Sequence, residues 1–112
     1  MIIEVSTHLP ADKESVWQAI TDPTQMREWY FDNIPDFKPE VGFATEFPVR
    51  SEERLFTHQW IVTKVVPQQE LRYRWSYREY PGEAEVEFHL DSEGTDTHLT
   101  LRFDGLETFP PD

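Results

Sequence analysis

Histidine and carboxylate side chains are the groups that could carry acid–base or metal chemistry in this sequence of 112 residues, which holds 4 histidines. Three of them, His8, His89 and His98, fall on the polar side of the strands that their neighbours predict. His58 instead shares the apolar side of its strand with Phe56. Metal binding requires three or four converging ligands, and the spacing of these histidines predicts no such set. We therefore expect neither a metal nor another cofactor, and His58 is the histidine that could line a cavity.

Carboxylates are numerous because the chain holds 22 acidic residues against 10 lysines and arginines. A catalytic carboxylate needs burial that shifts its pKa, whereas strand alternation places most of Glu46, Glu85 and Glu87 on the outer face. The sequence holds no Ser-His-Asp order, glycine-rich phosphate loop or HExxH motif. We assign no catalytic residue, because an enzyme would require a buried acid–base pair drawn from His58, Glu46 and the inward-facing tyrosines.

Aromatic side chains form 14% of the sequence and suggest ligand binding as the alternative to catalysis. Those predicted to point inward either fill a core or line a lipophilic cavity, and both interpretations stay open. Tyrosine and tryptophan also have polar tips that could orient a hydroxyl or carbonyl group of a ligand. The predicted ligand-cavity residues are Trp17, Trp29, Phe37, His58, Trp60, Tyr73, Trp75, Tyr77, Phe88 and Phe103.

The length and charge of the chain limit the classes of protein to which it can belong. Its 112 residues predict a single domain over residues 1–112. A formal net charge of -12 disfavours nucleic acids and anionic membranes as partners, because both are also negative. The absence of cysteine excludes disulfides and thiolate chemistry. Since the chain shows no signal-peptide pattern and no run of 18 apolar residues, we expect a cytoplasmic protein.

Hydrophobic periodicity predicts the elements that position these side chains. The first strand is expected to be half-buried, with Ile3, Val5 and Leu9 on its inner side. The predicted order is a strand at 3–9, helices near 12–20 and 23–30, a loop at 31–42 in which Ile34, Phe37 and Val41 turn inward, and strands at 43–49, 55–66, 71–78, 84–91 and 98–103. This order, βααβββββ, is typical of an α+β fold with one six-stranded antiparallel sheet and its helices on one face.

The register of one hairpin can be predicted from charge and hydrophobicity together. A turn at Tyr80-Pro81-Gly82 sets Trp75 opposite Val86 on the inner face of the sheet. The same register sets Arg74 opposite Glu87 on the outer face, which is a favourable cross-strand pair.

The two predicted helices are too short to cover the inner face of the sheet. Strands ~4.8 Å apart and ~3.3 Å per residue give a face of roughly 24 by 26 Å, of which helices about 14 and 12 Å long cover about 40%. Left bare, Tyr73, Trp75 and Phe88 would exceed the apolar patch that a soluble monomer tolerates. We therefore expect further cover from a small lipophilic ligand, a second copy in a homodimer, or a helix absent from these 112 residues.

Several segments also match one protein family in their order and spacing. They are Pro10-Ala-Asp-Lys-Glu-Ser-Val16-Trp17-Gln-Ala-Ile20-Thr-Asp-Pro23 with Trp29, then Phe37-Lys-Pro-Glu-Val-Gly42-Phe43, Val65-Val66-Pro67 before Leu71 and Trp75, Gly94-Thr95 before Leu99-Thr-Leu101, and Asp104-Gly105-Leu106. Over nearly the whole chain, the sequence resembles the SRPBCC (START-like, birch-pollen-allergen-like) superfamily. Within it, the chain looks most like the homologues of the activator of heat-shock-protein-90 ATPase.

The resemblance implies a helix-grip fold, in which a curved antiparallel sheet wraps around a long C-terminal helix with a cavity between them. This sequence stops at Asp112, where that helix should begin, so we expect the helix to be absent from these residues. Phe43 and Trp60 stand where the family commonly has glycine, which implies a partly filled cavity.

Three functional hypotheses follow from the residues and the resemblance. The first is a domain that binds a small hydrophobic or aromatic ligand between sheet and helices without catalysis. The second is a co-chaperone-like module of the stress response, which binds a chaperone partner through an acidic surface. The third is an enzyme of the cyclase or dehydratase kind, which the superfamily also includes.

Overall fold

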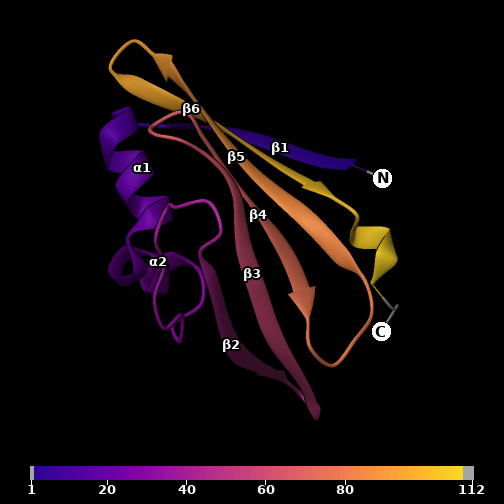
Figure 1. The fold of residues 1–112 in the computed structure, drawn as a ribbon. Coiled ribbons are helices and arrows are strands. Elements are labelled where there is room, and N and C mark those ends of the chain that lie inside the picture. Colours follow the sequence, from indigo (N-terminus) through magenta and orange to yellow (C-terminus); the bar gives the residue numbers. More distant parts are fainter. Residues whose placement is uncertain (1, 110–112) are drawn as a thin grey trace.

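The fold is a six-stranded antiparallel sheet with two short helices on one face. A computed structural model describes residues 2–109, apart from the side chains of Ser51 and Leu106. The elements are β1 (Ile2–Leu9), α1 (Lys13–Thr21), α2 (Pro23–Trp29), β2 (Ala44–Ser51), β3 (Arg54–Val66), β4 (Glu70–Tyr77), β5 (Glu83–Glu93), β6 (Asp96–Asp104) and the 3-10 helix η1 (Leu106–Thr108). The strand order is β1-β6-β5-β4-β3-β2 (Figure 1). The predicted α+β helix-grip class and the order βααβββββ are confirmed.

Both helices begin at aspartates that cap their first turns. The side chain of Asp12 accepts a hydrogen bond from the backbone N–H of Ser15 at 2.8 Å, and Asp22 does the same for Thr24 at 3.2 Å. These bonds satisfy N–H groups that have no partner inside the helix. No helix among the described residues is long and apolar enough to cross a lipid bilayer.

The core lies between the inner face of the sheet, meaning the face that carries the helices, and a roof of α1, α2 and the loop at residues 30–43. The roof contributes five buried apolar side chains, which are Val16, Ile20, Met26, Ile34 and Phe37. The sheet contributes Phe47, Trp60, Val62, Leu71, Tyr73, Val86, Phe88 and Leu90. Figure 1 shows the helices toward one end of the sheet and both chain termini toward the other.

The loop between α2 and β2 covers part of the inner face of the sheet. Arg27 of α2 donates hydrogen bonds to the carbonyl oxygens of Ile34 and Pro35, at 2.7 and 3.0 Å, and holds the loop inward. The predicted inward position is therefore confirmed for Ile34 and Phe37. It is wrong for Val41, which is 67% exposed because it lies in the turn before β2.

The predicted register of the β4–β5 hairpin is wrong by two residues, although each side chain faces the predicted side. Trp75 lies opposite Ala84, and Arg74 lies opposite Glu85 rather than Glu87. The reason is the length of the connection, since the last pair is Ser76 with Glu83 and a loop longer than a tight turn joins them. A shift of two residues preserves the face of every side chain, so alternation cannot detect it.

The first strand is also less buried than predicted. Every residue of β1 before Leu9 is exposed, and Ile3 and Val5 are 40% and 56% exposed. β1 pairs only with β6 and forms an edge of the sheet. Its inner side is bare because the roof lies toward the other end, and no described element covers the start of β1.

Candidate functional site

The inner face of the sheet is hollowed beside the roof and beyond it. The α1 hollow, of about 400 Å³, is lined by Leu9, Pro10, Ala11, Ser15, Val16, Ala19, Ile20, Trp29, Phe88 and Leu99. The His58 hollow, of about 340 Å³, is lined by Phe31, Val49, Arg54, Phe56, His58, Tyr77, Tyr80 and Phe109. The β1 hollow, of about 300 Å³, is lined by Ile3, Trp75, Tyr77, Ala84, Val86, Phe103 and Phe109. Ligand sites are commonly hollows of about 300–1,000 Å³ with mainly apolar walls.

The α1 hollow forms because small side chains on one side of α1 leave space above the sheet. Ala19 faces the hollow from the helix, and Phe88 and Leu99 face it from β5 and β6. Trp29 closes one side and is 47% exposed, and its indole N–H donates to the carbonyl oxygen of Ala19 at 2.7 Å. Because this bond gives the indole N–H a partner within the protein, the N–H is not offered to a guest. The surface of the hollow is therefore almost wholly carbon.

His58 lies at the centre of an aromatic cluster on the inner face, as its strand alternation predicts. Its ring stacks on Phe47 with centroids 5.0 Å apart and an angle of 13°, and Phe31 lies 4.8 Å away. Tyr77 meets it edge-on at 4.9 Å. Nδ1 lies 3.1 Å from the carbonyl oxygen of Phe56.

The charge state of His58 follows from its burial. The side chain is buried, and loss of hydration lowers its pKa below the usual range for histidine. The hydrogen bond to Phe56 and the charge of Glu79 act in the opposite direction but are weaker. His58 is therefore a neutral imidazole at neutral pH.

Glu46 does not form an acid–base pair with His58. It pairs with Gln59 across β2 and β3, and its carboxylate accepts a hydrogen bond from the Gln59 side chain at 3.0 Å and bonds to Arg78. Gln59 and His58 are adjacent in a strand, so their side chains point to opposite faces of the sheet. The hydrogen bond from Gln59, together with Arg78, also lowers the pKa of Glu46.

The predicted ligand-cavity residues separate into two groups. The structure places Trp29 and Phe88 in the α1 hollow, Trp75, Tyr77 and Phe103 in the β1 hollow, and His58 with Tyr77 in the His58 hollow. Phe37, Trp60 and Tyr73 lie in the closed core, and Trp17 packs against that core.

Sequence reasoning missed several residues that line these hollows. Ala19 and Leu99 lie on the inward sides of their elements, but a small or aliphatic side chain there predicts core packing as readily as a cavity wall. Phe56 shares the side of His58 and could have been found by the same alternation. Phe31 and Phe109 lie outside the strands, where no period indicates which side chains turn inward.

The indole N–H groups of Trp60 and Trp75 are buried without a hydrogen-bond partner among the described residues. The two residues pair across β3 and β4, and their rings meet edge to face with centroids 5.4 Å apart. An unpaired buried donor costs about 1–3 kcal/mol. An acceptor atom that reached Trp75 from the β1 hollow would therefore be stabilised.

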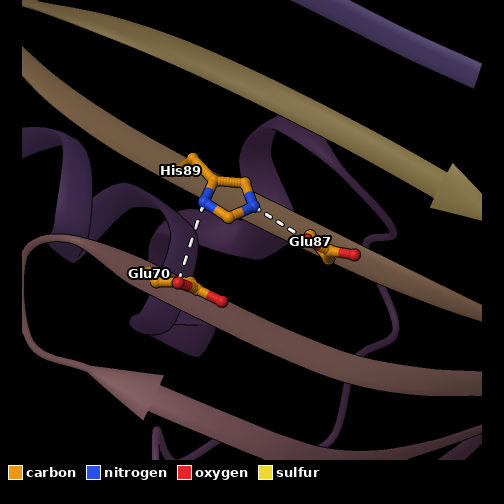
Figure 2. Close-up of side chains that lie close together, drawn as sticks. All are labelled: Glu70, Glu87 and His89. Atoms are coloured by element: carbon orange, nitrogen blue, oxygen red, sulfur yellow. Dashed lines mark hydrogen bonds and ion pairs between the residues drawn. The ribbon is translucent and has the colours of Figure 1, made fainter.

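Glu70, Glu87 and His89 gather on the outer face of the sheet. Figure 2 shows the His89 ring between the two carboxylates, 2.8 Å from Glu87 and 3.8 Å from Glu70. One potential ligand atom from each lies within 4.8 Å of the others, a spacing that suits a shared metal ion. However, Arg72 and Arg102 already lie 3.4 and 3.7 Å from the same oxygen of Glu87.

These cations give the outer-face cluster a different explanation. A metal ion would have to displace or approach two guanidinium groups, which repel it. Burial alone raises the pKa of Glu70, but the hydrogen bond from Arg72 and the nearby charges outweigh it and leave the pKa lowered. The cluster is accounted for as an ion-pair network that joins β4, β5 and β6.

Both the sequence and the fold are similar to those of known proteins. The model of the family described as Activator of Hsp90 ATPase homolog 1-like protein matches residues 10–111. A search of curated proteins finds no match.

Solved structures share the fold along nearly the whole chain. CV1439 from Chromobacterium violaceum is 20% identical with a TM-score of 0.79, and the match covers 93% of this chain and 78% of that one. MLL2253 from Mesorhizobium loti is 27% identical with a TM-score of 0.76, covering 95% and 77%. DynU16, a protein in the dynemicin biosynthetic locus, is 25% identical with a TM-score of 0.77, covering 94% of this chain but only 37% of DynU16.

Proposed function

Because this chain belongs to the family of Activator of Hsp90 ATPase homolog 1-like proteins, and because its sheet is hollowed on the inner face, we propose that it binds a small hydrophobic or aromatic ligand without catalysis. The observation that carries this proposal is the α1 hollow. Its lining is almost wholly carbon although the chain as a whole has a net charge of -12.

The expected affinity follows from the size of the α1 hollow. About 400 Å³ is near the lower end of the range for ligand sites, which suits a compound of about 20 non-hydrogen atoms. At about 0.3 kcal/mol per atom, such a ligand would bind with about 6 kcal/mol, or a Kd of tens of micromolar. Apolar contact supplies this energy, so we expect selection by shape more than by polar groups.

Fluorescence titration tests the proposal, because Trp29 lines the α1 hollow and its emission reports a bound guest. We expect at least one compound in a panel of naphthalene, decanol and a sterol to change the emission saturably. Ala19→Phe fills the hollow and should weaken that binding at least tenfold. Gln18→Phe, at the exposed neighbouring position of α1, is the matched control and should leave it unchanged. A panel without saturable binding, or equal binding by both variants, would contradict the proposal.

A protein-interaction module is the second candidate, and the exposed apolar residues of β1 favour it. Ile2, Ile3 and Val5 are 51%, 40% and 56% exposed on an edge strand, which offers unpaired backbone groups to another chain. A chaperone partner, as the family name suggests, or a second copy of the chain would be such a partner. Native mass spectrometry separates the outcomes, because a dimer, a retained small ligand and a bare monomer differ in mass. A pull-down with the Hsp90 ATPase that stayed empty at low salt would exclude the chaperone.

A further inference from the structure

The His58 hollow differs from the α1 hollow in having flat aromatic walls and two nitrogen-bearing side chains, His58 and Arg54. Phe56 contacts Tyr77 and Tyr80 with ring centroids 5.3 and 5.1 Å apart, and Tyr77 contacts Phe109 at 5.0 Å. These residues come from β3, the β4–β5 hairpin and the segment after η1. Because aromatic rings pair with one another in stacked or edge-on arrangements, such walls favour a planar aromatic guest.

The tautomer of His58 can be derived from its contacts. A carbonyl oxygen only accepts hydrogen bonds, so Nδ1, which lies 3.1 Å from the carbonyl of Phe56, must carry the ring proton. Burial keeps the imidazole neutral, so Nε2 has a lone pair and no proton. The contact with Phe56 occupies Nδ1, so Nε2 is the ring nitrogen that can accept a hydrogen bond from a guest in the hollow.

An acceptor in an aromatic hollow selects the ligand by its donor. A guest with a hydroxyl group gains a hydrogen bond to Nε2, whereas an ether of the same shape has no proton to donate. A hydrocarbon would leave the nitrogen unpaired, at a further cost. We propose that the His58 hollow binds a planar aromatic ligand with a phenolic hydroxyl group, which donates its hydrogen bond to Nε2 of His58.

This inference goes beyond the proposed function and does not depend on it. The His58 hollow shares no lining residue with the α1 hollow, so one site can be filled without the other. The two sites also differ in chemistry, because the first is expected to select by shape and the second by a hydrogen-bond donor.

Calorimetric titration with three naphthalene compounds at pH 8 tests the proposal. We expect 2-naphthol to bind about tenfold more tightly than 2-methoxynaphthalene, which has the same ring but no donor. Naphthalene, which carries no oxygen, should bind no more tightly than 2-methoxynaphthalene. His58→Phe keeps an aromatic ring in the cluster and should remove the preference for naphthol, whereas Ala19→Phe should retain it.

Nitrogen-15 spectra of the histidine rings provide a test that needs no variant. In the wild-type protein, His58 should carry its proton on Nδ1, and saturation with 2-naphthol should shift the Nε2 resonance. A proton on Nε2, an Nε2 resonance that does not move, or equal affinities for 2-naphthol and 2-methoxynaphthalene would overturn the proposal. Loss of naphthol binding in Ala19→Phe but not in His58→Phe would also overturn it, and would leave the α1 hollow as the binding site.

Discussion

Replacing Tyr73 by phenylalanine removes one hydroxyl group from the closed core and tests how the roof is held on the sheet. Tyr73 of β4 has no exposed surface, and its hydroxyl group lies 2.9 Å from that of Tyr30, the residue that follows α2. Burial raises the pKa of both tyrosines far above the usual value, so both groups stay protonated. One hydroxyl therefore donates and the other accepts.

The contacts of the two hydroxyl groups set the loss of stability expected from each substitution. Tyr73→Phe leaves the Tyr30 hydroxyl without its partner against the closed core, which costs about 1–3 kcal/mol. Tyr30→Phe should cost a similar amount, because it leaves the Tyr73 hydroxyl unpaired. The double variant removes both hydroxyl groups and keeps both rings packed against Trp60. The ring centroids of Tyr30 and Tyr73 lie 5.2 and 4.8 Å, respectively, from that of Trp60. We therefore expect the double variant to lie within about 1 kcal/mol of the wild type.

Urea unfolding followed by circular dichroism gives the free energy of unfolding for the four proteins of this cycle. The expected coupling energy, about 1–3 kcal/mol, is well above the error of such measurements. Tyr80→Phe is the control, since it changes a tyrosine outside the core and should alter stability by less than about 0.5 kcal/mol. Additive effects of the two core substitutions would refute the reasoning, because the hydroxyl groups would then be satisfied independently.

Two further predictions concern the surface and the turns. Hydrogen bonds to Glu93 and then Asp96 raise the pKa of the exposed His8 above 6.5, so its stabilising contacts should be complete below pH 6.5 and be lost as the pH rises through the raised value. An NMR titration of the His8 ring checks this, and a midpoint at or below 6.5 would contradict it. Gly82→Ala should destabilise the fold by more than Gly94→Ala in thermal unfolding, although both glycines have positive φ, of 103° and 65°. An added Cβ at Gly82 would lie 2.4 Å from the carbonyl oxygen of Thr108, the last residue of η1, whereas a Cβ at Gly94 would meet nothing within 4 Å. Equal losses of thermal stability in the two variants would refute the predicted clash.

Strand alternation predicted which side of the sheet each side chain faces, and this explains why His58 could be identified before its neighbours were known. Alternation depends only on the period of two that the backbone imposes. A shift of one strand by two residues along its neighbour leaves every side chain on the same face, so alternation cannot detect such a shift. The position of Trp75 opposite Ala84 therefore depends on the loop after Tyr77, whose length the sequence pattern did not define.

Periodicity also says nothing about what lies above a given face. Ile3 and Val5 alternate as a half-buried strand does, yet they are exposed because the roof lies elsewhere. Phe31 and Ile34 belong to a loop without a period, and their positions depend on tertiary contacts such as the bonds from Arg27. The walls of the hollows come from such contacts, so the sequence predicted their aromatic content but not their location.

The placement of the hollows follows from the aromatic core itself. Tyr30, Trp60 and Tyr73 stack directly between roof and sheet, with centroids 4.8–5.2 Å apart, so the middle of the inner face is filled. Hollows lie where this stack ends, on the side of α1 and on the side of His58, in addition to the β1 hollow. The inner face therefore does not form one continuous cavity, even though each hollow is lined by the apolar side of the same strands. Under the two proposals above, ligands of different chemistry would bind in separate hollows on one sheet, because the stack of Tyr30, Trp60 and Tyr73 fills the middle of its inner face.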